Sequence, residues 1–304
     1  MEEQPGKGEG VKICVSCGDT FESLDWKCPA CGSRPPCVGG FLSFAPELAD
    51  SNDGFSASYF SRLVELETGH FWFEGRNQVI LWGLRKYAPG ATNFLEVGCG
   101  TGVVLQAIGR CLPGMRLCGS EIFASGLPFA ARRLPGTELI QMDARRMPFH
   151  SEFDAICMFD VLEHIEEDAV VLREAWRSVK PGGTVLITVP QHPRLWSAVD
   201  EHSYHKRRYV AADLHGKLID AGFEVVHMTS FLSLLLPALI LSRLQYRKRD
   251  KQLSSGEALE IHPLWNRLCS QILGIERALI RLGVSLPAGG SLFAIARRPP
   301  QPIA

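Results

Sequence analysis

The apolar positions of this chain fall into short runs that alternate with longer amphipathic segments from about residue 93 onward. Aliphatic and β-branched runs are typical of buried strands, and a period of about 3.6 residues is typical of the helices that cover them. This alternation predicts an α/β fold with a parallel sheet and helices on both of its faces. The runs that we predict as strands are residues 94–97, 116–120, 139–142, 155–159, 184–189, 224–229 and 292–296.

Composition and turn residues divide the chain into segments. Residues 1–10 are charged and glycine-rich and are expected to form a flexible tail, whereas residues 11–37 contain five cysteines. Residues 38–56, rich in Gly, Pro and Ser, are expected to be a linker, and residues 57–300 to be the α/β domain. The long connection before the last predicted strand predicts a helical insertion at about residues 231–288.

Charge and cysteine content limit the class of protein. The chain has 304 residues, 46% of them hydrophobic, and a formal net charge of −1 at pH 7. A protein that binds phosphate backbones usually carries a basic excess, so nucleic acid is a disfavoured partner. The N-terminus lacks the apolar run of a secretory signal, and the apolar run at 231–241 is too short to span a bilayer. We therefore expect a cytoplasmic protein whose cysteines are reduced.

A glycine-rich loop follows the first predicted strand of the α/β domain. Gly98, Gly100 and Gly102 come directly after this strand, and a helical segment follows them. Glycine permits positive φ angles and a close approach of the backbone to a ligand, toward which the helix amides point. Glu96, which opens the loop, suits a cofactor with an ammonium and a sulfonium better than one with a pyrophosphate.

Two more carboxylates follow the next two predicted strands. Glu121 ends the second strand and can accept hydrogen bonds from both hydroxyls of a ribose. Asp143 ends the third strand, where it can meet the exocyclic amine of a purine. Each residue alone would also fit a solvated carboxylate at a strand end. Together with the glycine loop they predict a cofactor that contains a nucleoside.

These motifs resemble those of the class I S-adenosylmethionine-dependent methyltransferases. The strings FLEVGCGTG, GSEI, MDARRMPF, FDAICMFDVLEHI and VKPGGTVLITVP match the family in order, and the resemblance runs from about His70 to Arg298. It implies a Rossmann-like sheet of seven strands, the last antiparallel, with S-adenosylmethionine over the carboxyl ends of the first four. By the same resemblance the cofactor-binding residues are Arg76, Glu96, Gly98, Gly100, Gly102, Glu121, Asp143, Ala144 and Asp160.

Two subtypes of this family are disfavoured. No Asn/Asp-Pro-Pro-Tyr/Phe motif follows the fourth strand, which argues against amino methylation of adenine or glutamine. No Pro-Cys or Thr-Cys follows the fourth or fifth strand, which argues against a covalent cytosine mechanism.

Methyl transfer from a sulfonium requires an acceptor atom in line with the methyl group and, for some acceptors, a residue that takes a proton. His164, His202 and His205 are the candidate proton acceptors, with His192 as a further one. Each of these histidines can equally have a structural role.

Asp160, Glu163 and His164 raise the possibility of a metal site. Their spacing resembles the divalent-metal site of some O-methyltransferases, including ubiquinone-pathway and small-RNA 3′-end enzymes. By that resemblance Mg²⁺ would lower the pKa of an acceptor hydroxyl. Similar Leu-Glu-His strings occur in members without metal, so ordering of the loop around the cofactor remains an alternative.

The segment His70-Phe71-Trp72-Phe73-Glu74-Gly75-Arg76 resembles a recurrent element of bacterial members of this group. Its aromatic residues can roof the cofactor, with Arg76 as a partner for the methionine carboxylate. Alternatively, the segment can pack a helix against the edge of the sheet.

The N-terminal cysteines form two knuckles, Cys14-x2-Cys17 and Cys28-x2-Cys31, each followed by a glycine. Four thiolates suit tetrahedral zinc, which would stabilise a segment whose core is too small to fold alone. We therefore predict a structural zinc ribbon; iron, as in rubredoxin, is disfavoured by the short segment between the knuckles. Cys37 has no assigned role. Such a module can bind a partner protein, substrate or nucleic acid, or only cap the N-terminus.

The insertion combines apolar and basic residues. Residues 231–249 hold an apolar run and the cluster Arg243, Arg247, Lys248 and Arg249. Such a pattern can lie in a membrane interface, cover the active site or form a dimer surface, and we favour a helical lid. A second amphipathic helix is predicted by the apolar residues Leu264, Trp265, Leu268, Ile272, Ala278, Leu279 and Leu282.

The sequence as a whole predicts a methyltransferase that acts on a small or lipid-like acceptor, at oxygen. One alternative is an RNA or protein methyltransferase guided by the zinc ribbon. Another is a scaffold that binds the cofactor without catalysis. A closed pocket beyond the sulfonium would favour catalysis over the scaffold.

Overall fold

The computed structural model describes residues 10–23, 25–50, 55–248 and 259–301, without the side chains of residues 246–248. The expected tail, except for Gly10, therefore lies outside the described residues, as do residues 51–54 of the expected linker. The same holds for residues 249–258 of the insertion, which include Arg249.

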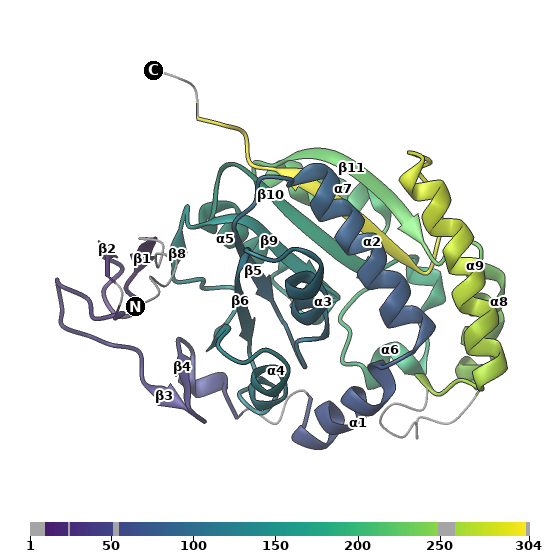
Figure 1. The fold of residues 1–304 in the computed structure, drawn as a ribbon, viewed down its shortest axis with the longest axis horizontal. Helices are drawn as coiled ribbons and strands as arrows, with labels where there is room; N and C mark the ends of the chain where they lie inside the picture. The colour runs from purple at the N-terminus through teal and green to yellow at the C-terminus, as the bar shows by residue number, and fades with distance from the viewer. Residues whose placement is uncertain (1–9, 24, 51–54, 249–258, 302–304) are drawn as a thin grey trace.

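A nine-stranded mixed sheet forms the centre of the molecule (Figure 1), in the order β11-β12-β10-β9-β5-β6-β7-β4-β3. Strands β5, β6, β7, β9 and β10 run parallel, and β12 pairs antiparallel with both β10 and β11. Seven of these strands confirm the predicted Rossmann-like sheet: β5 (Asn93–Val97), β6 (Arg116–Glu121), β7 (Glu138–Gln141), β9 (Phe153–Phe159), β10 (Val179–Pro190), β11 (Glu224–Phe231) and β12 (Ser291–Arg297).

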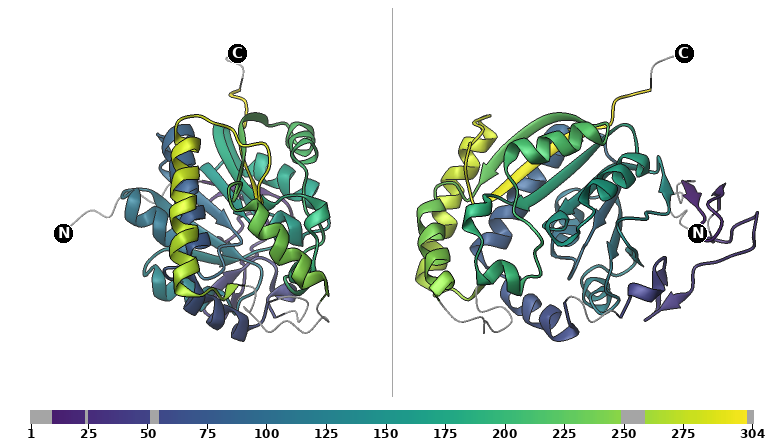
Figure 2. Two further views of the ribbon diagram at one scale, coloured as in Figure 1. Left: turned by 90° about the vertical axis from the view of Figure 1, so that its right-hand side faces the viewer. Right: turned by 180° about the vertical axis from the view of Figure 1, so that it is seen from behind.

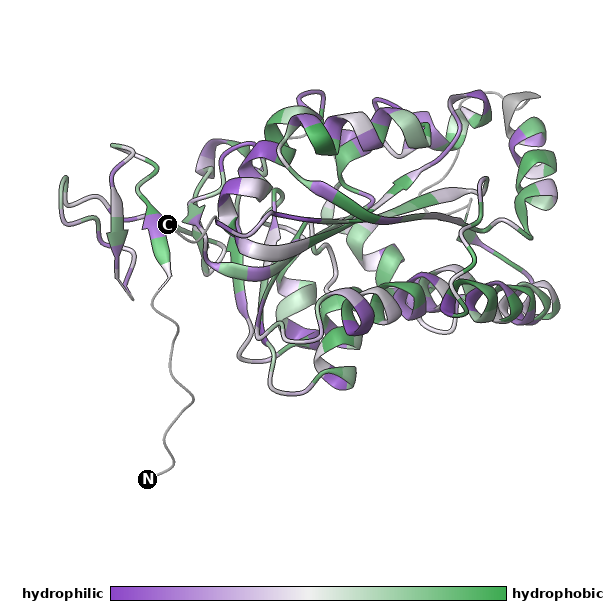
Figure 3. Ribbon diagram, turned by 90° about the horizontal axis from the view of Figure 1, so that it is seen from above, coloured by the Kyte–Doolittle hydropathy of each residue, from purple (hydrophilic) through white to green (hydrophobic). Residues whose placement is uncertain are grey.

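Alternating side chains of the strands build one core on each face of the sheet. In β5, Phe94 faces a core shared with Ile80 and Leu105, whereas Leu95 faces a core shared with Leu172 and Leu214. Because successive strand residues point to opposite faces, a strand that is apolar throughout is covered on both sides. Figure 3 shows this arrangement, with helices on both sides of the sheet seen edge-on.

The first of these cores is closed by α2, α3 and α4, and the second by α5 and α7. α1 continues the helical layer next to α4, and the short α6 follows β10. The long helical periodicity after Tyr59 is split into two helices at Gly69, which has a φ of 72°. The bounds of the helices are α1 (Ala57–Glu67), α2 (Phe71–Tyr87), α3 (Val103–Cys111), α4 (Leu127–Arg133), α5 (Asp168–Ser178), α6 (Ala198–His202) and α7 (Ala211–Asp220).

The segment that we expected to be a linker differs from that expectation. β3 (Cys37–Val38) and β4 (Phe41–Ser43) extend the sheet, and β4 pairs in parallel with β7. The buried Gln141 holds this addition, because its amide contacts Ser43 Oγ (2.6 Å), Ala45 N (3.1 Å) and Ala45 O (2.9 Å). The glycine- and proline-rich composition of this segment did not predict these short strands. Their pairing depends on Gln141, which lies about one hundred residues further along the chain.

The cysteine-rich segment packs against the edge of the α/β domain rather than standing apart. β1 (Val11–Ile13) pairs with β2 (Thr20–Glu22) and also, antiparallel, with β8 (Phe149–His150) of the α/β domain. Trp26 is buried at this junction, with ring centroids 4.5 Å from Phe44 and 5.6 Å from Phe149.

Two helices occupy the predicted insertion at the opposite end of the sheet (Figure 1): α8 (Leu236–Lys248) and α9 (Pro263–Arg281). α9 packs along α2, and α8 contacts α6. Among the described residues, no helix has the length and apolar character needed to cross a bilayer.

Candidate active site

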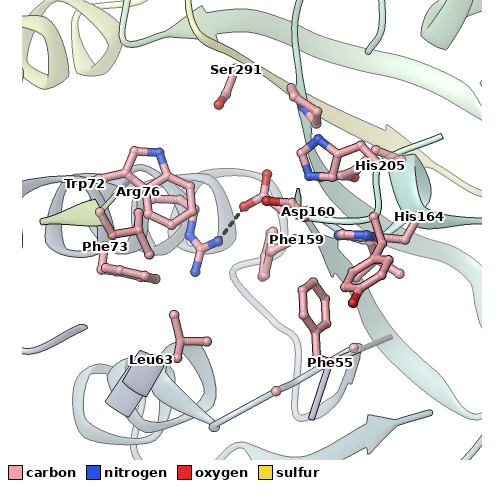
Figure 4. Close-up of a pocket in the computed structure, with 18 of the residues that line it drawn as sticks. Phe55, Leu63, Trp72, Phe73, Arg76, Phe159, Asp160, His164, His205 and Ser291 are labelled. Carbon is pink, nitrogen blue, oxygen red and sulfur yellow. Dashed lines mark hydrogen bonds and ion pairs between the residues drawn. The ribbon is translucent and has the colours of Figure 1, made fainter. Parts of the chain in front are cut away.

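A cavity of about 1000 Å³ opens over the carboxyl ends of β5, β6, β7 and β9. The glycine loop forms its floor, and residues from α1, α2, α6 and α8 form its walls. Figure 4 shows Arg76 and Asp160 near its centre, with Trp72 and Phe73 on one side and His164, His205 and Phe55 on the other. The size lies at the upper end of the range typical of small-molecule sites, which is about 300–1000 Å³.

The glycine loop takes the backbone conformation that its sequence predicts. Gly98, Gly100 and Gly102 have φ angles of 72°, 51° and 77°, which an L-residue rarely adopts. A side chain at Gly98 would clash, because an added Cβ would lie 2.5 Å from Val161 Cγ2. The loop thereby turns its backbone toward the cavity and directs the N-terminus of α3 at it.

Glu96 is buried at the floor of the cavity and is 2% exposed. Its Oε2 atom has no hydrogen-bond partner. Burial raises the pKa of this carboxyl to about 8, although the positive charge of Arg76 opposes the rise. A cationic ligand beside Glu96 would relieve the cost of burying its negative charge.

Glu121 and Asp143 both line the cavity, and both already have partners. Glu121 accepts hydrogen bonds from the backbone amides of Gly100 (2.9 Å) and Ile122 (2.9 Å), while burial raises its pKa. Asp143 forms an ion pair with Arg145 (2.9 Å). Ala144 lies beside them in the lining. The structure therefore brings these predicted residues to one side of the cavity.

Arg76 and Asp160 form a partly buried ion pair across the cavity, with Nη1 2.5 Å from Oδ2. Trp72 flanks the guanidinium, which lies 4.4 Å from its ring centroid. The sequence left two roles open for the segment His70–Arg76, and the structure supports both. Helix α2 packs on the sheet, and its first turn lines the cavity. Arg76 was expected to face a methionine carboxylate; here its Nη1 pairs with Asp160, while its Nε has no hydrogen-bond partner.

Glu163, His164 and His205 come together at the far wall of the cavity. Their ligand atoms all lie within 4.8 Å of one another. Our expectation that Asp160 belongs to this group is wrong, because Asp160 pairs with Arg76 and accepts a hydrogen bond from Thr188 (3.2 Å). The third member of the group is His205, which comes 41 residues after His164 in the sequence. Only the fold brings these two histidines together.

The electrostatics of this group are unusual. Burial raises the pKa of Glu163 well above its ordinary value, and Asp160 adds to the effect. Both carboxylate oxygens of Glu163 lack a hydrogen-bond partner. Burial, together with the neighbouring His205, lowers the pKa of His164 to about 3, which keeps its ring neutral at physiological pH.

Asp200, which the sequence analysis did not single out, holds His205 in place. Its Oδ1 lies 3.0 Å from His205 Nδ1, and it also accepts from Arg208 (2.6 Å). Asp200 is fully buried, and the histidine and arginine contacts hold its pKa far below the ordinary value despite that burial. An Nδ1–H donated to Asp200 leaves the Nε2 lone pair of His205 free toward Glu163, 4.0 Å away.

The remaining candidate histidines differ in their placement. His202 lines the cavity but is outside the Glu163–His164–His205 group, whereas His192 does not line it. Sequence analysis also missed Phe55, whose ring lies 5.5 Å from that of His164, and Tyr59, which stacks on Phe55 at 4.3 Å. No pattern in the sequence marks these two residues, since they lie far from the glycine loop along the chain.

The four predicted zinc ligands converge at the N-terminal module. The Sγ atoms of Cys14 and Cys31 lie 3.6 Å apart, and those of Cys17 and Cys28 lie 3.7 Å apart. All four sulfurs lie within 4.8 Å of one another, a spacing compatible with one tetrahedral ion. Backbone amides of Cys17 and Ser16 lower the pKa of Cys14 to about 6, although burial opposes this change. Of the five cysteines in residues 11–37, Cys37 lies outside this group.

The strand order, the glycine loop after β5 and the acidic residues after β6 and β7 define the class I methyltransferase fold. Residues 95–187 match the family described as a methyltransferase domain. The chain therefore carries the methyltransferase domain of that family at residues 95–187.

Two curated relatives illustrate what the chain is similar to. A probable S-adenosylmethionine-dependent methyltransferase of Mycobacterium tuberculosis H37Rv is 27% identical over 171 residues, which cover 55% of this chain and 60% of the relative. The ubiquinone biosynthesis O-methyltransferase of Pseudomonas putida W619 is 31% identical over 124 residues, which cover 38% of this chain and 52% of the relative. The chain thus matches roughly half to three-fifths of the length of these relatives.

Solved structures of related fold are more distant in sequence. Phosphoethanolamine N-methyltransferase 2 of Haemonchus contortus in complex with S-adenosyl-L-methionine superposes with a TM-score of 0.56 at 17% identity, over 98% of this chain and 70% of that one. A Haloferax volcanii methyltransferase in complex with the Trm112 activator gives a TM-score of 0.55 at 16% identity, over 84% and 100% of the two chains. At these identities the likeness concerns the fold alone.

The cysteine cluster generates a direct prediction about metal content. We expect one zinc ion per chain in purified protein and none in Cys28→Ala, because three thiolates cannot complete the tetrahedral site. Elemental analysis by inductively coupled plasma mass spectrometry measures this, with Cys37→Ala as the matched control that keeps its zinc. Stoichiometric iron, or equal zinc in wild type and Cys28→Ala, would contradict the assignment.

Proposed function

We propose that this chain transfers the methyl group of S-adenosylmethionine to an oxygen atom of a small or lipid-like acceptor. One observation carries the proposal: a single cavity joins the glycine loop to the Glu163–His164–His205 group. The first feature suits the cofactor, and the second suits an acceptor that must lose a proton. The likeness to ubiquinone biosynthesis O-methyltransferases, which matched over part of their length, is consistent with oxygen as the acceptor atom.

The proposed cofactor position follows from the cavity floor. The ribose would lie at Glu121, and the adenine beside Asp143 and Ala144. The ammonium and sulfonium would lie over Glu96, whose buried carboxylate lacks a positive partner on one oxygen. Arg76 and Asp160 border the methionine end, so the carboxylate of methionine can compete with Asp160 for the guanidinium.

In the proposed reaction the acceptor oxygen attacks the methyl carbon as the carbon–sulfur bond breaks. The sulfonium becomes the neutral sulfide of S-adenosylhomocysteine, and the hydroxyl proton leaves to a base. His205 is the proposed base, because Asp200 fixes its Nδ1 and leaves Nε2 free. The roof formed by Trp72, Phe55 and Tyr59 would exclude water from the methyl group.

Glu163, His164 and His205 are also a donor set that fits a divalent cation. One carboxylate and two imidazoles converge, His164 is kept neutral, and Asp200 supplies the second hydrogen bond that metal-binding histidines usually make. The unpartnered oxygens of Glu163 are the observation that favours this assignment. A cation held there would lower the pKa of the acceptor hydroxyl.

Two other functions are less well supported. A cofactor-sensing scaffold would not need the space beyond the glycine loop, which here extends to α8 and its apolar side chains. An RNA or protein methyltransferase guided by the zinc ribbon would need an accessible ribbon surface. One side of the ribbon is taken up by the pairing of β1 with β8 and by the burial of Trp26 against the α/β domain, and the exposed runs at residues 16–20 and 29–32 contain no basic side chain.

The ribbon's role in this proposal is to support the wall of the cofactor site. The segment between β7 and β8 contains Asp143 and is held at its far end by β1, with Ile13 N 3.0 Å from Pro148 O. Arg146 donates a hydrogen bond to the carbonyl of Val15, which lies within the Cys14-x2-Cys17 knuckle. Zinc would therefore stabilise the adenine side of the cavity from a distance.

The raised pKa of Glu96 predicts how cofactor binding depends on pH. A cation binds better to the ionised carboxyl, so lowering the pH below about 8 should weaken S-adenosylmethionine binding by up to about tenfold per pH unit. Calorimetry between pH 8.5 and 6.5 measures this effect. In Glu96→Gln the slope should be lost, whereas Glu47→Gln, an exposed matched control, should retain it. An equal slope in Glu96→Gln would remove Glu96 from the site.

The proposed cation generates a separate prediction. Titration of Mn²⁺ into the cofactor-bound protein should give one site, weakened by at least about tenfold in His205→Ala and unchanged in His202→Ala. Because burial raises the pKa of Glu163, cation binding should also release protons at pH 7. If wild type binds no divalent cation, proton transfer to His205 alone remains the mechanism.

A further inference from the structure

Helix α9 has more apolar surface than its packing requires. At about 100° per residue, seven apolar side chains form one stripe along the helix that is about 100° wide. Four of them are at least 60% exposed: Leu264 (74%), Trp265 (62%), Ile275 (60%) and Leu282 (82%). The full stripe consists of Leu264, Trp265, Leu268, Ile272, Ile275, Leu279 and Leu282.

A different side of α9 holds the helix on the domain. Leu273 and Ile280 are buried, and Leu273 fits against Gly75 of α2, where an added Cβ would lie 2.6 Å from its Cδ1. Glu276 is buried as well and accepts hydrogen bonds from the amides of Ser233 and Leu234, each at 2.8 Å. These contacts fix the orientation of α9 and leave most of the stripe facing outward, although Ile272 is partly buried against the same core.

Helix α8 lies at the same end of the molecule as α9 but apart from it (Figure 2, left), and it is apolar on two sides. Its inner side lines the cavity with Leu235, Ala238 and Leu239. Its outer side exposes Ile240, Leu241 and Leu244. The cavity lining also includes Cys269 of α9 and Ile261 just before it, so the cavity reaches the region between the two helices.

The charges on α9 itself are mainly positive, although Glu74 of α2 lies near Arg277 and the exposed Glu260 comes just before the helix. α9 contains Arg267, Arg277 and Arg281, and its one acidic residue, Glu276, is the buried one. Arg281 shares a shallow depression with Arg85 and Lys86 of α2, next to Leu282 at the end of the stripe. An apolar stripe with an interfacial tryptophan and flanking arginines is the pattern of a helix that lies in an anionic lipid interface.

We propose that the outer side of α8 and α9 is a membrane-binding surface for anionic phospholipid, and that the acceptor enters the cavity between these helices from the bilayer. The proposed lipid contact rests only on the exposed apolar and basic residues of α8 and α9 and does not depend on the proposed function. The entry route rests on the proposed methyltransferase function and narrows its acceptor to a molecule held in lipid. A symmetric dimer through the same surface is disfavoured, because it would bring arginine-flanked stripes of two copies together.

Vesicle sedimentation tests the surface with the full-length, zinc-loaded chain. Wild type should bind vesicles of phosphatidylcholine and phosphatidylglycerol in a 3:1 ratio, and pure phosphatidylcholine much more weakly. The variant Trp265→Asp/Ile275→Asp should bind the mixed vesicles at least about tenfold more weakly, because it places charges in the apolar stripe. Ile219→Asp, which adds one such charge at an exposed apolar position of α7, should bind like wild type.

A second measurement does not depend on the folding of the double variant. Brominated lipid should quench the tryptophan fluorescence of wild type, and most of this quenching should be lost in Trp265→Phe, which keeps the apolar surface. Absence of wild-type binding to the mixed vesicles would overturn the proposal, as would unchanged binding of the double variant or unchanged quenching in Trp265→Phe. So would a lipid-free dimer that the double variant abolishes, because the stripe would then belong to a second copy.

Calorimetric binding of S-adenosylmethionine in the same samples separates the two proposals. The double variant should bind the cofactor like wild type, since no residue of the stripe lines the cavity. Vesicle binding without cofactor binding would refute the proposed function and leave the membrane surface standing; the reverse result would refute the surface alone.

Discussion

Buried carboxylates around one cavity impose the constraint on which the site depends. Burial raises the pKa of Glu96, Glu121 and Glu163, and Glu96 and Glu163 retain oxygen atoms without a partner. Burying an ionised carboxyl without a counter-charge is costly, so such a site favours ligands that bring positive charge or hydrogen-bond donors. A cofactor with an ammonium, a sulfonium and two ribose hydroxyls brings both. A divalent cation at Glu163 would supply the positive charge that its unpartnered carboxylate oxygens lack.

The parallel sheet is what makes this arrangement possible. Parallel strands end at the same edge, so the residues after β5, β6, β7 and β9 meet although they are spread over many residues of sequence. Additions at the two ends of the sheet then complete the cavity. The cysteine-rich segment and β4 hold the β7 side, where Asp143 lies, while α8 and α9 close the β12 side and connect the cavity to an apolar surface.

The sequence predicted the parts of this structure that depend on local pattern. The strands, the glycine loop and the convergence of Cys14, Cys17, Cys28 and Cys31 all follow from periodicity and short spacing. The sequence analysis failed where a long-range contact decides the outcome. It placed Asp160 in the proposed metal group, whereas the ion pair with Arg76 draws Asp160 away and the fold brings in His205. It also missed β4, because that strand depends on the buried Gln141.

The central claim is that this cavity binds S-adenosylmethionine through the carboxylate at the end of β6. Calorimetry on wild type and Glu121→Ala tests it most directly, with the exposed Glu47→Ala as a control. We predict one site of about micromolar affinity in wild type and Glu47→Ala, weakened by at least about tenfold in Glu121→Ala, because the ribose hydroxyls lose their acceptor. No binding to folded, zinc-loaded wild-type protein, or equal affinity in Glu121→Ala, would contradict the account.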